Sequence, residues 1–291
     1  MLTLNFQNSA GNMLPLINNE WFDLTNVDAQ TSMHSSISSS VVGGMDGDTV
    51  TNVQADPRSI VLDLQIKSGK NVELAKREIL KYFKAKQKGT LVWTQENKTK
   101  EITGLVEVIE MPRWTDSVVL QITLHCEQPF WQDIDYVVQL ISEAINVHYF
   151  TDYSNDMLFF PEDGIVLGEY DVTRTRTFIN NGDVSVGLII TVTAVATVTN
   201  PIIYDSYGHY FGVGYGEGVK QLVLEAGDVV VITTEKGKKS VTLNGINIIS
   251  KVKPNSTWLQ LGTGEQQFSI NSDDENINNM FFTLEYKQRY V

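Results

Sequence analysis

The sequence predicts a mainly β protein with two domains, of which the first carries one α-helix and the second is a β-sandwich. Three observations lead to this prediction. Most apolar stretches alternate apolar and polar residues, which is the period of a strand with one buried face. A single stretch has the period of an amphipathic helix. In the second half, turn residues recur at intervals of roughly ten residues, which is typical of a sandwich.

We place the first domain at residues 1–132. Its strands are expected from the alternating stretches at 2–6, 20–27, 58–66, 89–95, 101–111 and 116–131. Between the second and third of these lies a stretch rich in Ser and Gly, residues 31–50. It lacks a large apolar stripe, and its turn chemistry predicts either a mobile loop or a long hairpin arm.

The helix is expected over residues 71–86. Val72, Ala75, Ile79 and Phe83 fall on one stripe of this segment, while its charged residues lie elsewhere. Asn71 is a suitable N-cap, and a glycine follows the lysine-rich end of the segment. The first domain therefore contains one helix that buries a single face.

The stretch HCEQPFW, residues 125–131, holds the single cysteine of the chain between a histidine and a glutamate. Neighbouring side chains of a strand point to opposite faces, so His125 and Glu127 cannot converge on the thiol. Cys126 instead continues the apolar face of Leu120, Ile122 and Leu124, where cysteine acts as a small hydrophobic residue. We therefore expect a structural role for Cys126 and the end of the strand before Pro129.

We place the second domain at residues 133–291. Residues 132–160 are ambiguous between a helix and a pair of strands, and strands and turns are expected from about residue 158. A meander is expected over 218–249, and Asn244-Gly245 gives the strongest hairpin signal in the chain.

Composition excludes several classes of protein. The chain has 291 residues and a formal net charge of −13, which argues against a protein that grips nucleic-acid phosphates or anionic lipid. One cysteine excludes an intrachain disulfide. The first residues lack the features of a signal peptide, and the most apolar run, 186–198, is too short to span a bilayer. We expect a protein made in a cytoplasm, without membrane insertion.

No catalytic, metal or cofactor site emerges from the motifs. The histidines at 34, 125, 148 and 209 do not pair with ligands at zinc spacing. The glycine-rich run at 208–218 precedes a strand, so we interpret it as a flexible surface loop and not as a phosphate loop. The acidic stretches at 46–48 and 272–276 do not match a calcium loop and are interpreted as solvated turns.

Tyr207, Tyr210 and Tyr215 are candidate glycan contacts, because exposed aromatic rings stack on sugars. A carbohydrate-binding module that contacts the host cell wall is therefore one alternative function. A glycan-degrading enzyme is another, because its paired carboxylates need not be close in the sequence. No feature of the sequence singles out such a pair.

The order of the elements resembles that of the distal tail proteins (Dit) of siphophages, the siphovirus tail-component family. In the first half the resemblance rests on DPRSIVLDLQI, REILKYF, GTLVWTQ, EITGLVEVIEM and the ending HCEQPFW. In the second half it rests on INNGDVSVGLIITV, TNPIIYDSYGHYF, LVLEAGDVVVITTEKGKKSVTLNGINI and YKQRYV. These motifs are individually loose, but their order covers nearly the whole chain.

This resemblance implies a virion structural protein of a phage or prophage tail, with no catalysis and no cofactor. It implies a C-terminal sandwich of the galectin-like or jelly-roll type and a homo-hexameric ring formed by the N-terminal domains. The ring is expected at the distal end of the tail, assembled in the bacterial host cytoplasm. Its expected partners are the tail tube protein, the tail-tip protein and receptor-binding or baseplate proteins. DNA is expected to pass the channel without specific binding.

Overall fold

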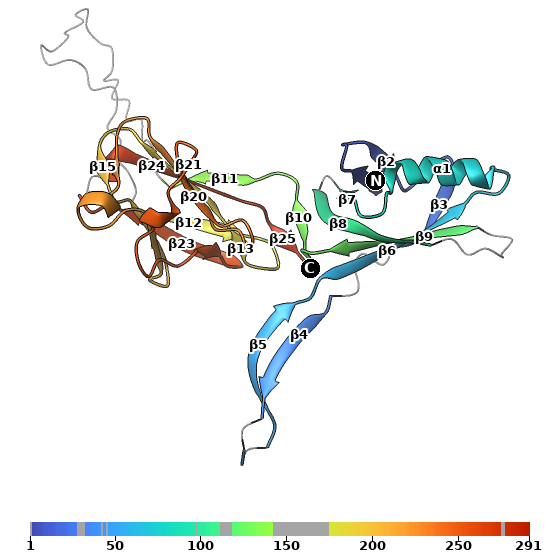
Figure 1. The fold of residues 1–291 in the computed structure, drawn as a ribbon, viewed down its shortest axis with the longest axis horizontal. Helices are drawn as coiled ribbons and strands as arrows, with labels where there is room; N and C mark the ends of the chain where they lie inside the picture. Colours follow the sequence, from blue (N-terminus) through green and yellow to red (C-terminus); the bar gives the residue numbers. More distant parts are fainter. Residues whose placement is uncertain are drawn as a thin grey trace, which may run out of the picture. The chain divides into compact units, whose positions relative to one another are not determined.

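The computed structural model describes residues 2–27, 33–41, 43–44, 46–96, 98–110, 118–141, 175–274 and 277–291. The chain divides into two compact units, Met1–Asp135 together with Arg289–Val291, and Tyr136–Gln288. The predicted fold class is confirmed, because strands dominate both units and the described residues contain one α-helix, in the first unit (Figure 1).

In its described residues the first unit holds eleven strands and the helix. They are β1 (Thr3–Asn8), β2 (Met13–Pro15), β3 (Phe22–Val27), β4 (Ser35–Ser40), β5 (Thr49–Ala55), β6 (Arg58–Ile66), α1 (Val72–Tyr82), β7 (Lys88–Gln95), β8 (Lys98–Glu110), β9 (Val119–Cys126), β10 (Trp131–Asp133) and β25 (Arg289–Tyr290).

Nine of these strands form one antiparallel sheet, whose main path runs β2-β1-β7-β8-β9-β6-β3. At one end of β8, β10 adds to the sheet and pairs in turn with β25. The buried residues alternate along the strands, and β6 and β9 give the clearest cases. One face of this sheet therefore forms the core of the first unit.

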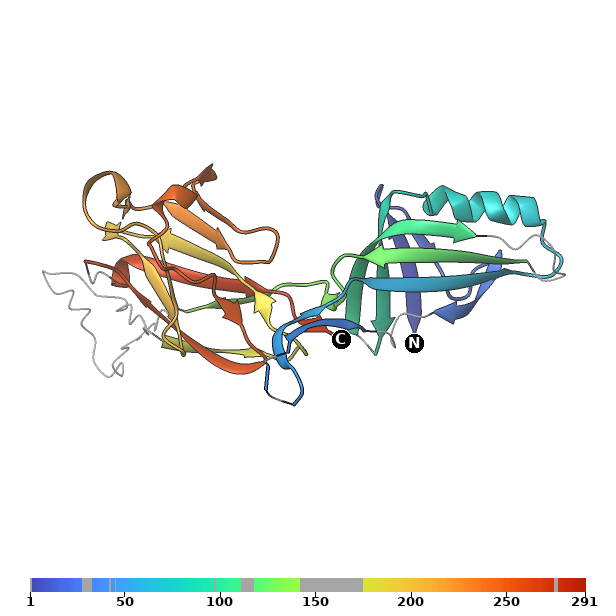
Figure 2. The ribbon, with the colours of Figure 1, turned by 60° about the horizontal axis from the view of Figure 1, so that its bottom comes forward.

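Helix α1 lies alongside this sheet (Figure 2). The Asn71 side chain accepts a hydrogen bond from the backbone N–H of Leu74, which confirms the predicted N-cap. Ala75, Ile79 and Phe83 are buried as expected, and the Phe83 ring stacks on Phe6 of β1 with 3.9 Å between centroids.

Two details of the helix prediction are wrong. Val72, in the first turn, is 38% exposed and does not join the buried stripe. The helix ends at Tyr82 and not at residue 86, because Phe83 takes an extended backbone conformation. The following lysines belong to a turn before β7, where Lys86 has a φ of 67°.

The described part of the second unit holds fourteen strands and three short 3-10 helices. They are β11 (Val137–Leu140), β12 (Thr175–Asn180), β13 (Val186–Gly187), β14 (Ile189–Ala194), β15 (Val198–Thr199), β16 (Ile202–Asp205), β17 (Tyr210–Gly212), η1 (Gly218–Lys220), β18 (Val223–Leu224), β19 (Val229–Thr233), β20 (Ser240–Leu243), β21 (Ile246–Asn247), η2 (Ile249–Lys251), β22 (Gln260–Leu261), β23 (Gly264–Asn271), η3 (Ile277–Asn279) and β24 (Met280–Tyr286).

The second unit is built on two main sheets. The larger runs β11-β24-β14-β19-β20-β21, and the smaller runs β12-β23-β16-β17. Their buried side chains meet in one hydrophobic cluster, to which Ile190 and Phe282 contribute from the larger sheet. Phe178 and Phe268 contribute from the smaller sheet, and their rings pack edge to face at 5.6 Å. This arrangement is a β-sandwich.

The hairpin predicted at Asn244-Gly245 is confirmed between β20 and β21. Both residues have positive φ angles, 49° and 82°, as the two central residues of a type I′ turn require. The Asn244 side chain also accepts from the backbone N–H of Val229 and donates to Asp228, so it fixes the neighbouring turn as well.

The prediction of a flexible surface loop at 208–218 is wrong for residues 210–214. Tyr210–Gly212 form β17, and Phe211, Gly212, Val213 and Gly214 are buried. Glycine is typical of flexible loops, but it is also required where another group packs closely against the backbone, and the second reason applies here. A Cβ at Gly214 would lie 2.1 Å from the Oδ1 atom of Asn200.

The segment that was ambiguous between helix and strands begins with β10 and β11. Its remainder beyond Ile141, and the strands and turns expected from about residue 158 as far as residue 174, lie outside the described residues. None of the described helices is long and apolar enough to cross a membrane.

Candidate functional site

The Ser/Gly-rich stretch forms a hairpin arm, made of β4, β5 and the turn between them. Among the strands that the structure describes, its two strands pair only with each other, as a separate two-stranded sheet. Every residue of both strands is exposed. The base of the arm is held by a hydrogen bond from the Ser36 hydroxyl to Asp56 at 2.6 Å. Figure 1 shows the arm extending away from the end of β6.

The register of the arm gives it one apolar face and one polar face. Ile37 lies opposite Val53, and after a bulge Ser39 lies opposite Val50 on the same face. The exposed fraction of these apolar side chains is 62% for Ile37, 59% for Val53 and 53% for Val50. The other face carries only polar side chains, among them Ser38 opposite Asn52.

This apolar face was missed in the sequence because half of it lies on β5, beyond the Ser/Gly-rich stretch, and the bulge shifts the register. An isolated two-stranded hairpin is marginally stable in water, and an uncovered apolar face adds to that problem. The arm is therefore suited to pack against another protein surface, and it is our main candidate functional site.

The stretch that holds Cys126 has a structural role, as predicted. Cys126 is fully buried at the end of β9, and Gly104 on β8 leaves room for its sulfur, since a Cβ there would lie 2.8 Å from Sγ. Burial raises the pKa of the thiol to about 12, although the nearby Arg58 guanidinium opposes this shift. A thiol with so high a pKa is a poor nucleophile at neutral pH.

The three tyrosines proposed for glycan contact have different surroundings. Tyr207 is 77% exposed at the turn between β16 and β17, and its ring lies 6.3 Å from that of His209. Both residues are held by Asp205, which accepts from their backbone N–H groups at 2.9 Å. Tyr215 is half-buried beyond β17.

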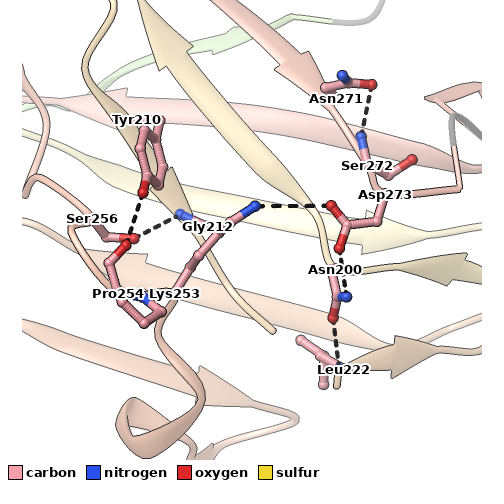
Figure 3. Close-up of polar contacts among 10 residues, drawn as sticks. All are labelled: Asn200, Tyr210, Gly212, Leu222, Lys253, Pro254, Ser256, Asn271, Ser272 and Asp273. Carbon is pink, nitrogen blue, oxygen red and sulfur yellow. Dashed lines mark hydrogen bonds and ion pairs between the residues drawn. The ribbon is translucent and has the colours of Figure 1, made fainter. Parts of the chain in front are cut away.

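Tyr210 is committed to the fold of the second unit. Its hydroxyl donates to the backbone carbonyl of Pro254 at 2.8 Å (Figure 3), and its ring lies 6.0 Å from that of Tyr204. Among the described residues no ring contact or hydrogen bond joins the three tyrosines to one another. A glycan contact at these positions stays a prediction.

Asp273 and Asp274, the described carboxylates of the acidic stretch predicted at 272–276, also belong to the scaffold. Asp273 accepts from the buried side chain of Asn200 at 2.7 Å, and Asn200 accepts in turn from the backbone N–H of Leu222 at 2.8 Å (Figure 3). Lys253 lies 3.9 Å from the other Asp273 oxygen. Asp274 accepts from the backbone N–H of Thr199. These carboxylates bind neighbouring loops together.

The described part of the chain contains no group of three or more His, Cys, Asp or Glu side chains placed to hold a metal ion. Of the histidines considered above, His148 lies outside the described residues. His209 contacts Asp205 at 2.9 Å, and His125 lies on the face of β9 opposite Cys126.

Two protein-family models match the chain. Residues 14–126 match the phage tail protein RIFT-related domain, and residues 181–290 match the C-terminal domain of the siphovirus-type tail component. Together the two models cover most of the chain, the first within the first unit and the second almost entirely within the second. No curated protein sequence matches it.

Solved structures also resemble the chain. The crystal structure of the Dit protein (gp 19.1) of SPP1, described as a paradigm of the hub adsorption apparatus in phages that infect Gram-positive bacteria, matches with a TM-score of 0.69 and 11% identity. That match covers 100% of both chains and shows a shared fold. A chain of the phage P2 baseplate in its activated, Ca-bound conformation matches over 100% of both chains with 10% identity and a TM-score of 0.47.

Proposed function

The chain belongs to the siphovirus-type tail component family, the distal tail proteins of siphophages, and from this premise we propose that it builds the hub of a phage tail. Six copies form a ring at the distal end of the tail. The ring joins the tail tube to the tail tip or baseplate, and DNA passes through its channel. The protein acts by symmetric assembly, without catalysis.

The hairpin arm is the observation that carries this proposal. It presents an apolar face that nothing in the described part of its own chain covers, and it lies in the first unit, which we propose forms the ring. A ring is built by repeating one contact between two different surfaces of the same chain. An arm that is exposed in one copy and covered by the next supplies one side of such a contact.

The charge of the chain supports passage of DNA without retention. The formal net charge is −13, and an acidic surface repels phosphate, so a negatively charged channel would let DNA slide without sticking. A ring whose channel is lined by basic side chains would contradict this part of the proposal.

We assign the second unit to contacts with tip, receptor-binding or baseplate proteins, and the ring of first units to the tail tube. The chain passes from the first unit to the second after Asp135 and returns to the first unit at Arg289, so two covalent connections join the units. The returning segment, β25, pairs with β10 of the first unit. A mechanical force on the second unit would therefore be shared by two polypeptide connections.

Native mass spectrometry of the purified full chain tests the proposal directly. We expect a species of six times the chain mass of 32.6 kDa. A variant without residues 35–55 provides the matched comparison, and it should remain folded but lose the hexamer. A monomeric full chain would refute the ring, and a hexamer that survives loss of the arm would refute the role of the arm.

A further inference from the structure

The smaller sheet of the second unit carries two tyrosines on its outer face. Along β16 and β17, Ile203 and Phe211 are buried in the core of the sandwich, so Tyr204 and Tyr210 lie on the opposite face. The register pairs the two tyrosines directly across these strands, with 6.0 Å between their ring centroids. Both tyrosines are half-buried, so part of each ring is open to solvent.

A lysine and an aspartate lie beside this pair of rings. The stem of Lys253 lies over Gly212 of β17, where a Cβ would be 3.1 Å from the Cδ atom of the lysine. Its Nζ atom lies 5.9 Å from the centre of the Tyr210 ring and 3.9 Å from a carboxylate oxygen of Asp273 (Figure 3). The two charges oppose each other, so this part of the face offers strong hydrogen-bonding groups without a net charge.

The fold holds these side chains in place. The Tyr210 hydroxyl donates to a backbone carbonyl at 2.8 Å, and Asp273 accepts from the Asn200 amide at 2.7 Å. The backbone N–H of Lys253 donates to the carbonyl of Gly212 at 2.9 Å, which ties this lysine to the edge of β17. Groups that are already positioned lose little conformational entropy when they bind a ligand.

We propose that the tyrosine face, defined by Tyr204, Tyr210, Lys253 and Asp273, binds a neutral saccharide through one pyranose ring. The C–H face of a pyranose is apolar and packs on an aromatic ring, while its hydroxyls need both donors and acceptors. The tyrosines supply the aromatic surface, and the ammonium and carboxylate supply the donor and the acceptor. An anionic ligand would require a net positive charge, which this pair does not provide.

The tyrosine face differs from the glycan contact predicted from the sequence. Of the three tyrosines named there, Tyr210 alone belongs to it, and Tyr204 joins it through the register of β16 with β17. Tyr207 lies at the turn beyond these strands. The inference goes beyond the hub role and concerns the second unit alone.

Saturation-transfer NMR on the full chain tests the site, with maltose, cellobiose, lactose and N,N′-diacetylchitobiose as probes. We expect transfer to the ring protons of at least one probe. Tyr204→Ala should weaken its binding about tenfold, because the stacking surface is lost. Lys253→Met keeps an apolar stem over the glycine but removes the ammonium, and it should weaken binding by a similar factor. Tyr204→Phe keeps the ring and should bind as the wild type does.

Tyr207→Ala is the matched control, because it removes an exposed tyrosine from the neighbouring turn. Loss of binding in this variant would move the site to the turn and overturn the tyrosine face. Transfer to none of the four probes, or wild-type affinity in either Tyr204→Ala or Lys253→Met, would also overturn it. Calorimetry checks that each variant stays folded, and Lys253→Met tests the site even where Tyr204→Ala is destabilised.

Discussion

Replacing the apolar face of the arm should strongly weaken assembly without destabilising the subunit. In the double variant Ile37→Ser/Val53→Ser, two side chains that face each other across the hairpin lose their apolar groups. They are 62% and 59% exposed, so a covering partner can still bury more than half of each.

The expected magnitude follows from this exposure. Complete burial of such a side chain contributes about 1.5–3 kcal/mol, so the exposed fraction corresponds to about 1–2 kcal/mol for each residue. The two together give about 2–4 kcal/mol for each contact, which is roughly a 30-fold to several-hundred-fold change in the association constant. The melting temperature of the monomer should stay nearly unchanged, because neither residue contributes to the core.

Sedimentation velocity over a concentration series measures the association constant, and calorimetry measures the melting temperature. Asn52→Ser is the matched control, because Asn52 lies on the polar face of the same hairpin. If the double variant assembles as well as Asn52→Ser does, the arm does not contribute its apolar face to an interface. If the melting temperature of the double variant falls by many degrees, the arm stabilises its own subunit and the reasoning is also wrong.

Four further predictions concern the subunit. The Cys126 thiol, whose pKa burial raises to about 12, should react with a thiol reagent at pH 8 only after unfolding, and fast reaction of the native protein would contradict its burial. As the pH rises above the usual thiol value of 9.0 towards 12, the unfolded chain ionises first, so native stability should fall in that window by calorimetry. Gly89→Ala would place a Cβ 2.2 Å from the Phe6 ring and should cost about 1–3 kcal/mol in urea unfolding, with an unchanged midpoint as the refuting result. Asn200→Ala removes two side-chain hydrogen bonds at a residue with a φ of 51° and should cost about 2–4 kcal/mol, whereas a cost below about 0.5 kcal/mol would refute its role in the scaffold.

The parts of the fold that were predictable from the sequence depend on local signals. The N-cap at Asn71, the alternation that buries Cys126 and the turn at Asn244-Gly245 each follow from a few consecutive residues. Helix periodicity also identified Ile79 and Phe83 as buried. Such features need no knowledge of which distant segment packs against them.

The features that matter most for the proposed function depend on distant pairings. The apolar face of the arm requires the register of β4 with β5, including its bulge. In the same way, one pocket of the first unit is lined by Trp93, Trp131 and Tyr290, which come together because β25 returns to pair with β10. A pattern within one segment carries no information on such pairings, so neither feature was predictable.

Negative-stain electron microscopy tests the central claim most directly. The purified chain would be imaged alone and after co-expression with the products of its neighbouring tail genes. The account predicts sixfold rings with a central channel, and larger assemblies built on those rings when the neighbours are present. Separate monomers in both samples would contradict the hub, and would make the glycan-binding alternative at Tyr207 the next hypothesis to test.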